Sequence, residues 1–368
     1  MSGSCDIEGT ILTPDGWVAG RIRHGARITA IEGTAVEVPT PPFILPGFVD
    51  CHVHGGGGAD MMEGAEAIAI SARLHARHGT TAFCPTSVTA PVAQTETFLD
   101  ALAGVMADPP SGAARILGAH LEGPFLNPGK LGAQPPFAIP ADAELLRDWA
   151  RRAPLRIVTF APEMDPDGAL HAALDALGIR AQIGHSLCDY AMARAAFAKG
   201  AAATHLFNAM SGIAHRGNGL CGAAFAHAER AEIIPDLIHV EAGAILAARR
   251  AIPYLHGVTD ATAGAGMPDG PYRLGGQEIV KADGAMRLPD GTLAGSALTM
   301  DVALRNLVEI GLPLAEAARR LSTLPADWLG RTDIGRLAPG AHADLIVAND
   351  ALRIDRVVIG GERIDGVS

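Results

Sequence analysis

The amino-acid sequence predicts a (β/α)8 TIM barrel, an α/β fold of eight parallel strands and helices, joined to a small β-sandwich made from both termini. Three observations predict it. Short apolar, β-rich runs alternate eight times with alanine-rich amphipathic stretches in the middle of the chain. Both ends carry short strand-like pieces broken by glycine and aspartate. The chain has 368 residues, 48% of them hydrophobic, which is enough for one large core and a small second one.

The barrel is predicted over residues 47–332. Its eight candidate strands are, in order, FVDCHVH, TTAFCPTS, ARILGAHLEG, RIVTFAPE, AQIGHS, AAATHLFN, EIIPDLIHV and LHGVTDA. Most of them are separated by amphipathic segments such as AEAIAISARLHARHG and TETFLDALAGVMAD, which a glycine or a turn closes. A doubly wound parallel sheet is the alternative arrangement of the same elements.

The two ends of the chain are predicted to form one domain. Short strand-like pieces such as GTILT and GWVAGRIRH occupy the N-terminal end, and DLIVAND and RIDRVVIGG occupy the C-terminal end. Neither end alone has enough apolar surface to fold. We therefore expect residues 1–46 and 333–368 to make a single β-sandwich packed against the barrel.

Composition and charge exclude several classes of partner. The net charge is −11, and no dense lysine or arginine run could follow a phosphate backbone, so we expect no nucleic acid. No stretch reaches about 18 uninterrupted apolar residues, and the N-terminus lacks the features of a signal peptide. We expect a cytoplasmic protein without a membrane partner.

Polar side chains recur where the predicted strands end. The residues found there are His52 and His54 on the first strand, Glu122 on the third, His185 on the fifth, His205 on the sixth and Asp260 on the eighth. Catalytic groups in such barrels lie at this end of the strands. Any one of these histidines alone is equally well explained as a hydrogen-bonded core residue. As a set they indicate a site, because an apolar strand has little other reason to end in an imidazole or a carboxylate.

These side chains predict a divalent metal. Imidazole nitrogen and carboxylate oxygen suit Zn²⁺, which we expect, and the same ligands accept Fe, Co or Mn. Glu122, His185 and His205 would hold one ion and leave a position open for water. His52 and His54 point to the same face of their strand, so they can grip a second ion bridged through Glu122.

Asp260, in VTDATAG, has a predicted task beside that metal. A bound ion lowers the pKa of its water toward about 7. Asp260 would accept the proton of the attacking water and pass it to the leaving nitrogen, which is general acid–base catalysis by one carboxylate.

Several segments together carry a family resemblance: PGFVDCHVHG, GAHLEGPFLNPGKLGAQPP, IGHS, ATHLFNAM and VTDATAGAGMPDG, with LAGSALTM behind them. They resemble the amidohydrolase superfamily and, within it, the N-acetylglucosamine-6-phosphate deacetylase family. The likeness covers nearly the whole chain. Its specific part is HLEGPF followed by THLFNAM, whereas HxH alone indicates only an amidohydrolase. The resemblance implies metal-dependent hydrolysis of the N-acetyl amide of N-acetylglucosamine 6-phosphate to acetate and glucosamine 6-phosphate, in amino-sugar catabolism.

The resemblance also implies catalytic roles. Glu122, His185 and His205 match the principal metal ligands of the family, and Asp260 matches its catalytic acid and base. His239, in LIHV, matches the histidine that polarises the acetyl carbonyl. Other amidohydrolases bridge two metals with a carboxylated lysine after the fourth strand. That stretch here is TFAPEMD and has no lysine, so Glu122 must be the bridge if two ions bind.

The substrate pocket follows from the same resemblance. Arg216 matches the arginine that pairs with the 6-phosphate, a task suited to its planar fork of donors. The positions that line the sugar pocket are Ala133, Asn208, Ala209, His239, Leu293, Ala294 and Gly295. Around Arg216 the chain reads AHRGNGLCG where the family often has Arg-Glu-Pro-Gly, which leaves the phosphate geometry and the sugar open.

Three alternatives to this function are considered. The substrate could be the galacto epimer, N-acetylgalactosamine 6-phosphate, because one hydroxyl orientation is read by pocket shape. Another amidohydrolase, acting on a cyclic amide or an N-acyl amino acid, would lack the HLEGPF and THLFNAM pairing. A non-catalytic metal-binding scaffold would have lost a ligand or Asp260, and none is lost. Symmetric dimers are common among such enzymes, so we expect a homodimer.

Overall fold

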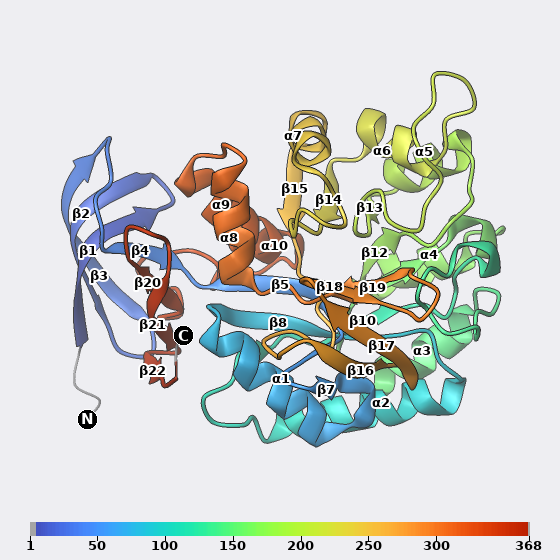
Figure 1. The fold of residues 1–368 in the computed structure, drawn as a ribbon, viewed down its shortest axis with the longest axis horizontal. Coiled ribbons are helices and arrows are strands. Elements are labelled where there is room, and N and C mark those ends of the chain that lie inside the picture. Colours follow the sequence, from blue (N-terminus) through green and yellow to red (C-terminus); the bar gives the residue numbers. More distant parts are fainter. Residues whose placement is uncertain (1–4, 367–368) are drawn as a thin grey trace.

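Residues 5–366 are described by a computed structural model, in which a barrel from the middle of the chain lies beside a sheet from its two ends (Figure 1). Residues 1–4 and 367–368 of the predicted terminal domain lie outside the described residues. The predicted fold class is confirmed. Within residues 5–366, no helix combines the length and the apolar character needed to cross a membrane.

Eight parallel strands form the barrel, and their spatial order is their chain order. They are β5 (Phe48–Val53), β8 (Thr80–Ser87), β10 (Ala119–Glu122), β11 (Leu155–Phe160), β12 (Arg180–Ile183), β13 (Ala202–Ala203), β14 (Arg230–Ile233) and β15 (Tyr254–Gly257), and the short β9 (Arg115–Ile116) pairs with β8. A parallel bridge between Val53 and Ala261 joins the first strand to the segment after the last, which closes the ring. Each predicted strand segment overlaps one of these eight strands.

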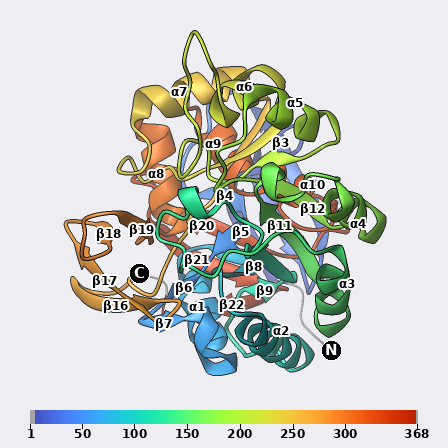
Figure 2. The same ribbon diagram turned by 90° about the vertical axis from the view of Figure 1, so that its right-hand side faces the viewer.

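Helices surround the barrel strands (Figure 2). They are α1 (Ala65–Arg77), α2 (Val92–Ala107), α3 (Ala143–Arg152), α4 (Ala169–Leu177), α5 (Tyr190–Ala198), α6 (Leu220–His227), α7 (Ala242–Ala251), α8 (Met300–Glu309), α9 (Leu314–Leu321) and α10 (Thr323–Trp328), with 3-10 turns η1 (Met61–Glu63), η2 (Pro128–Lys130) and η3 (Pro162–Met164) in the loops. Side chains at the N-terminal ends stabilise some of these helices. Asp142 and Asp189 cap α3 and α5 by accepting hydrogen bonds from backbone N–H groups of the first turn. Helix α3 then buries Leu146 and Trp149 in the barrel's hydrophobic core.

The two ends of the chain form one continuous seven-stranded sheet. Its strands, in spatial order, are β22 (Glu362–Ile364), β21 (Ile354–Ile359), β20 (Leu345–Ala348), β4 (Phe43–Pro46), β1 (Cys5–Thr13), β2 (Gly16–His24) and β3 (Ile28–Val36). The N-terminal and C-terminal strands meet where β4 pairs antiparallel with β20. This sheet has its own small apolar cluster, separate from that of the barrel, which includes Ile22, Ile44 and Val347. The domain limits at residues 46 and 333 stay a prediction.

A further small sheet stands on the barrel, within the stretch that the sequence assigned to the barrel alone. It contains β16 (Gly270–Leu274), β17 (Gln277–Ala282), β18 (Ala285–Arg287) and β19 (Leu293–Ser296), all antiparallel, and a second pair is formed by β6 (Gly55–Gly56) and β7 (Ala59–Asp60). Apolar residues of β16–β19 pack with Val88 of the loop after β8. Asp60 accepts a hydrogen bond from the backbone of Gly275, and Gln277 donates one to Ala133. The sheet is thereby attached to loops at the carboxyl ends of the barrel strands.

Candidate metal centre and active site

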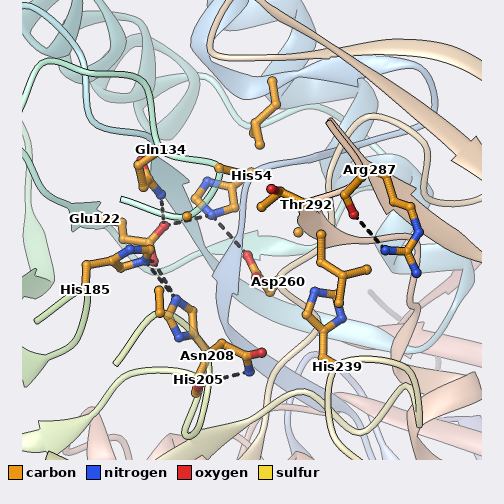
Figure 3. Close-up of a pocket in the computed structure, with 17 residues that line it drawn as sticks. His54, Glu122, Gln134, His185, His205, Asn208, His239, Asp260, Arg287 and Thr292 are labelled. Carbon is orange, nitrogen blue, oxygen red and sulfur yellow. Dashed lines mark hydrogen bonds and ion pairs between the residues drawn. The ribbon is translucent and has the colours of Figure 1, made fainter. Parts of the chain in front are cut away.

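The six side chains expected at the strand ends meet in one buried cluster at the carboxyl end of the barrel. Figure 3 shows all of them except His52. His52 lies in β5 and Glu122 ends β10, whereas His54, His185, His205 and Asp260 lie one to three residues beyond the ends of β5, β12, β13 and β15. The adjacency of neighbouring parallel strands brings these residues together although they span more than half of the chain.

The outer part of the cluster consists of Glu122, His185 and His205. The Nε2 atoms of both histidines lie 2.9 Å from Oε1 of Glu122 and 3.1 Å from each other. Three potential ligand atoms therefore converge on one point at the bottom of a pocket. This is the three-ligand arrangement expected of a metal site with an open position.

The inner part consists of His52, His54 and Asp260. Nε2 of His54 lies 3.1 Å from Oδ1 of Asp260, 3.1 Å from Oε2 of Glu122 and 3.2 Å from Nε2 of His52. Glu122 thus presents one oxygen to the outer histidines and the other to the inner pair. The carboxylate has the position required of a bridging ligand.

The donor set fits a divalent cation. Burial opposes protonation of His54, yet its hydrogen bonds to Asp260 and Glu122 raise its pKa to about 9. Burial alone would raise the pKa of the Glu122 carboxyl, but the surrounding histidines, His52 and His185 first, hold it well below its usual range. Positive charge is therefore strongly favoured among these carboxylates, and a metal ion supplies it in place of protons.

Both outer histidines and Asp260 have unusual backbone conformations. His185, His205 and Asp260 have φ angles of 47°, 21° and 50°, in the left-handed region that residues with a side chain rarely adopt. Such conformations persist only when the surrounding structure enforces them, and they concentrate at functional sites. His52, by contrast, lies within β5 and has no positive φ.

Asp260 is held where it can transfer a proton. Its backbone N–H donates to the carbonyl of His52, 2.9 Å away. Burial raises the pKa of the Asp260 carboxyl, but His52 and His54 outweigh that effect and bring it below the ordinary value. The side chain is therefore an anion at neutral pH and is available as a base. Asp50 supports the same loop, because its carboxylate accepts hydrogen bonds from the backbone N–H and the hydroxyl of Thr259.

Glu232 and Gln182 are supporting residues that sequence reasoning missed. Oε2 of Glu232 lies 3.1 Å from Nδ1 of His52, and Gln182 donates to its other oxygen at 2.9 Å. A carboxylate in this place fixes the ring so that Nε2 faces the cluster. The available signal was a polar residue among apolar neighbours inside each buried strand, in RAEI of β14 and RAQI of β12.

His120 belongs to the core and not to the cluster's ligand shell. Its Nδ1 lies 2.9 Å from the carbonyl of Cys51, and its Nε2 lies 2.8 Å from the hydroxyl of Thr159. Complete burial lowers its pKa to about 3. Both ring nitrogens are thus engaged, as expected of a neutral structural histidine.

A pocket of about 380 Å³ opens above the cluster. It is lined by His54, Glu122, Gly132, Ala133, Gln134, His185, His205, Asn208, Ala209, His239, Asp260, Leu274, Arg287, Gly291, Thr292, Leu293 and Gly295. Most of the predicted pocket residues are therefore brought together. Two are not: Ala294 is fully buried behind the lining, and Arg216 lies on the exposed 212–217 loop outside it.

His239 lines the pocket from the loop after β14. Its Nδ1 lies 2.6 Å from Oδ2 of Asp236, which also accepts hydrogen bonds from the backbone of the same loop. Burial lowers the pKa of His239, but the hydrogen bond and charge of Asp236 dominate and raise it above its ordinary value. The opposite edge of the ring is directed into the pocket (Figure 3).

Gln134 is a second residue that the sequence analysis did not single out. Its carbonyl oxygen accepts a hydrogen bond from the backbone N–H of Thr89, 2.6 Å away, and its amide donates to Oε2 of Glu122. The Thr89 bond sets the orientation of the amide. Gln134 therefore supports the bridging carboxylate and faces the pocket beside it (Figure 3).

A buried histidine and carboxylate cluster at the mouth of a (β/α)8 barrel defines a metal-dependent hydrolase, and comparison with known proteins agrees. The model of the amidohydrolase family matches residues 43–364. The chain belongs to this family, whose members are metal-dependent.

Its similar relatives are deacetylases. It is 37% identical to the N-acetylgalactosamine-6-phosphate deacetylase of Escherichia coli O157:H7, over 96% of this chain and 97% of the relative. It is 34% identical to the N-acetylglucosamine-6-phosphate deacetylase of Lysinibacillus sphaericus, over 92% of this chain and 88% of that protein. Among solved structures, a mutant N-acetyl-D-glucosamine-6-phosphate deacetylase from Mycobacterium smegmatis, in complex with N-acetyl-D-glucosamine-6-phosphate, is 32% identical with a TM-score of 0.88, covering 97% of this chain and 98% of that one.

Proposed function

We propose that the protein is a metal-dependent deacetylase that hydrolyses the N-acetyl amide of N-acetylglucosamine 6-phosphate to glucosamine 6-phosphate and acetate in amino-sugar metabolism. The observation that carries the proposal is the placement of Glu122 between two histidine pairs, with Asp260 at hydrogen-bond distance from His54. The names of the relatives support the substrate class.

In this proposal Glu122, His185 and His205 hold the reactive ion, and His52 and His54 offer a second position. Zn²⁺ fits this mixed nitrogen and oxygen donor set, which Fe, Co or Mn also match. Such an ion supplies a Lewis acid and a water of lowered pKa. The chain's task is then to keep these five ligands converged and to exclude bulk water from the pocket floor.

Asp260 carries the proton in both stages of the reaction. As an anion it accepts the proton of the attacking water, and as the acid so formed it protonates the departing nitrogen. Its hydrogen bond to His54 and its fixed loop hold the carboxylate against the pocket floor, where the amide must lie. Holding the carboxylate beside the amide lowers the entropic cost of bringing the reacting groups together.

His239 and the remaining lining residues position the acetyl sugar. We assign to His239 the polarisation of the acetyl carbonyl, supported by its exposure to the pocket and its raised pKa, which favours a ring that donates a hydrogen bond. Asn208, Ala209, Leu293 and Gly295 shape the sugar site around it. Ala133 belongs to the same wall.

N-acetylgalactosamine 6-phosphate is a second candidate substrate. The relative from Escherichia coli O157:H7 carries that name and is 37% identical over nearly the whole of both chains. Both epimers carry the same acetamido group and the same 6-phosphate, so the residues of the metal cluster do not distinguish them. The predicted homodimer, the predicted cytoplasmic location and the pairing of Arg216 with phosphate stay predictions.

An acetate-release assay tests the proposal. Purified protein is depleted of metal with a chelator, reconstituted with Zn²⁺, and given N-acetylglucosamine and N-acetylgalactosamine with and without the 6-phosphate. We expect no release from the depleted protein and restored release from the gluco 6-phosphate after reconstitution. Release only from the galacto 6-phosphate would select the second candidate, and release from none of them would contradict both.

A further inference from the structure

Two arginines begin the barrel strands on either side of β13, at the end of the barrel opposite the metal cluster. Arg180 is the first residue of β12, and Arg230 is the first residue of β14. The strand between them, β13, consists of two alanines, whose small side chains leave space at this end. Because the metal cluster lies at the carboxyl ends of the strands, these guanidinium groups have no part in the chemistry proposed above.

Both guanidinium groups lie over aromatic rings. The Cζ atoms of Arg180 and Arg230 lie 5.2 Å and 5.6 Å from the centre of the Trp328 ring. Cζ of Arg230 also lies 4.4 Å from the centre of the ring of Tyr254, its partner in the register of β14 and β15. Trp328 belongs to α10 and is 6% exposed. Two positive charges are therefore held near one buried indole, where the rings replace part of their water.

The chain provides no anion for either arginine. Among residues 5–366, neither guanidinium group forms an ion pair or a hydrogen bond. Burial lowers the pKa of Arg180 below its ordinary value, and the charge of Arg230 lowers it further. Nη1 of Arg230 and Nε1 of Trp328 are buried without a hydrogen-bond partner among the described residues. Buried donors in native proteins are nearly always paired, so acceptor atoms are missing at this place.

Arg320, near the same end of the barrel, shows how a structural arginine is satisfied. It donates to the carbonyl of Leu255, 2.5 Å away, and pairs with Glu316 at 2.8 Å. An arginine that only supports packing is expected to have partners of this kind. Their absence at Arg180 and Arg230 favours an anion that comes from outside the chain.

A cavity of about 420 Å³ lies beside Arg230 and offers space for such an anion. Its wall includes Trp328 and the turn that leads into β13 at Gly200 and Ala201. Glu229 also lines the cavity, but its side chain is exposed and pairs with neither arginine. The volume falls in the range of small-molecule sites, about 300–1,000 Å³, so it can hold a phosphate group with a small organic substituent.

We propose that this cavity binds a small phosphate-bearing anion, with Arg230 in direct contact and the charge of Arg180 adding to the attraction. The guanidinium group suits phosphate because its planar fork of donors forms two parallel hydrogen bonds. The bound anion neutralises two like charges that the chain leaves unpaired, and it therefore stabilises the folded protein. The site is separate from the pocket above the metal cluster, and the inference does not depend on the proposed function.

Calorimetric titration of the metal-loaded enzyme with inorganic phosphate tests the proposal. Arg230→Met removes the contact and Arg180→Met removes the second charge. Arg194→Met is the matched control, because Arg194 is an exposed arginine of α5 that does not line the cavity. We expect phosphate binding to weaken about 10- to 100-fold in Arg230→Met, about 3- to 10-fold in Arg180→Met and less than about 2-fold in the control. Phosphate bound at the metal cluster contributes equally to all four proteins, so the differences report this site.

Thermal unfolding provides a second measurement on the same proteins. Phosphate at about 10 mM should raise Tm of the parent and the control by more than that of Arg230→Met, since a ligand stabilises only the state that binds it. A parallel titration with glycerol 3-phosphate distinguishes the source of the anion. Tighter binding than that of inorganic phosphate would assign the cavity to a phosphate ester, and equal or weaker binding would assign it to inorganic phosphate.

Two results would overturn the inference. One is the same phosphate affinity and the same rise in Tm in the parent and in Arg230→Met, and the other is an equal loss in the Arg194→Met control. Acetate release by Arg230→Met without added phosphate should stay within about threefold of the parent, which checks that the variant is folded. Arg230→Lys keeps the charge but loses the fork, so binding should weaken a few-fold. If Arg230→Met fails to fold, unchanged affinity in both Arg230→Lys and Arg180→Met would contradict the proposal.

Discussion

The inner histidines, His52 and His54, and the outer histidines, His185 and His205, share Glu122 but are carried by different kinds of backbone. The inner pair lies in and directly after β5, two residues apart, and neither histidine has a positive φ. The outer pair lies in loops beyond β12 and β13, in left-handed conformations.

The two pairs also differ in what supports their second ring nitrogen. His52 is fixed by the buried Glu232, and His54 by the carbonyl of Thr86. His185 is fixed by a backbone carbonyl, whereas the buried Nδ1 of His205 has no hydrogen-bond partner among the described residues.

The two histidine pairs therefore differ in how their positions are fixed and in how they face the pocket. The inner pair is pre-organised by a strand and a buried carboxylate, and it holds Asp260 in place through His54. The outer pair depends on strained loops, and both of its rings face the pocket. We infer that the ion at Glu122, His185 and His205 carries the reaction, and that the inner pair adjusts it.

The largest expected effect comes from an outer ligand. His205→Ala removes one of three donors from the reactive ion, so the charge stabilisation that the ion provides is lost. We expect kcat/KM for acetate release to fall about 10⁴-fold. Metal content measured by elemental analysis should fall by one ion per chain, and a variant with normal turnover would contradict the assignment of the outer site.

Asp260→Asn separates proton transfer from metal binding. The amide keeps the size of the side chain but cannot accept and return a proton, so kcat should fall about 10³-fold while the outer ion remains bound. Single-turnover acetate release and metal analysis on the same preparation check both parts. A loss of activity that added metal restores would mean that Asp260 acts as a ligand only.

Glu232→Gln tests the support of the inner pair. Glutamine can still accept from Nδ1 of His52 but lacks the negative charge that supports the ring, so affinity for an ion at the inner position should fall about 10- to 100-fold. Turnover should change only a fewfold, because Glu232 contacts the outer ligands only through the backbone N–H of His205, from which the side-chain oxygen of glutamine can still accept. Competition with a metal-binding dye measures the affinity, and an equal weakening of both ions would show that the two positions are not separable.

The smallest expected effect is on thermal stability, through the contact between Asp236 and His239. Because Asp236 raises the pKa of His239 in the folded protein, this contact stabilises the fold below the ordinary histidine pKa of about 6.5 and ceases to do so as the pH rises through the folded value. Asp236→Asn should therefore lower Tm by about 1–2 °C at pH 6 and by less at pH 9. Calorimetric scans at the two pH values check the sign, and a larger loss at pH 9 would contradict it.

The sequence predicted the barrel and the cluster because both follow short-range patterns. Alternating strands and helices specify the barrel, and polar residues at strand ends specify which side chains meet. The β16–β19 sheet was missed, since its short hairpins contain no helix and interrupt no barrel strand. Arg287 was missed with it. Glu232 and Gln182 were missed because a polar residue inside a strand signals that it has a partner, but the fold is needed to show that Glu232 pairs with His52 and Gln182 with Glu232.

The measurement that tests the account most directly uses the double variant His52→Ala, His54→Ala. After metal removal and titration with Zn²⁺, acetate release from N-acetylglucosamine 6-phosphate is followed against the number of ions bound per chain. We predict one bound ion and turnover within about tenfold of the parent enzyme. A double variant that binds one ion at Glu122, His185 and His205 yet releases no acetate would contradict the claim that the outer ion carries the reaction.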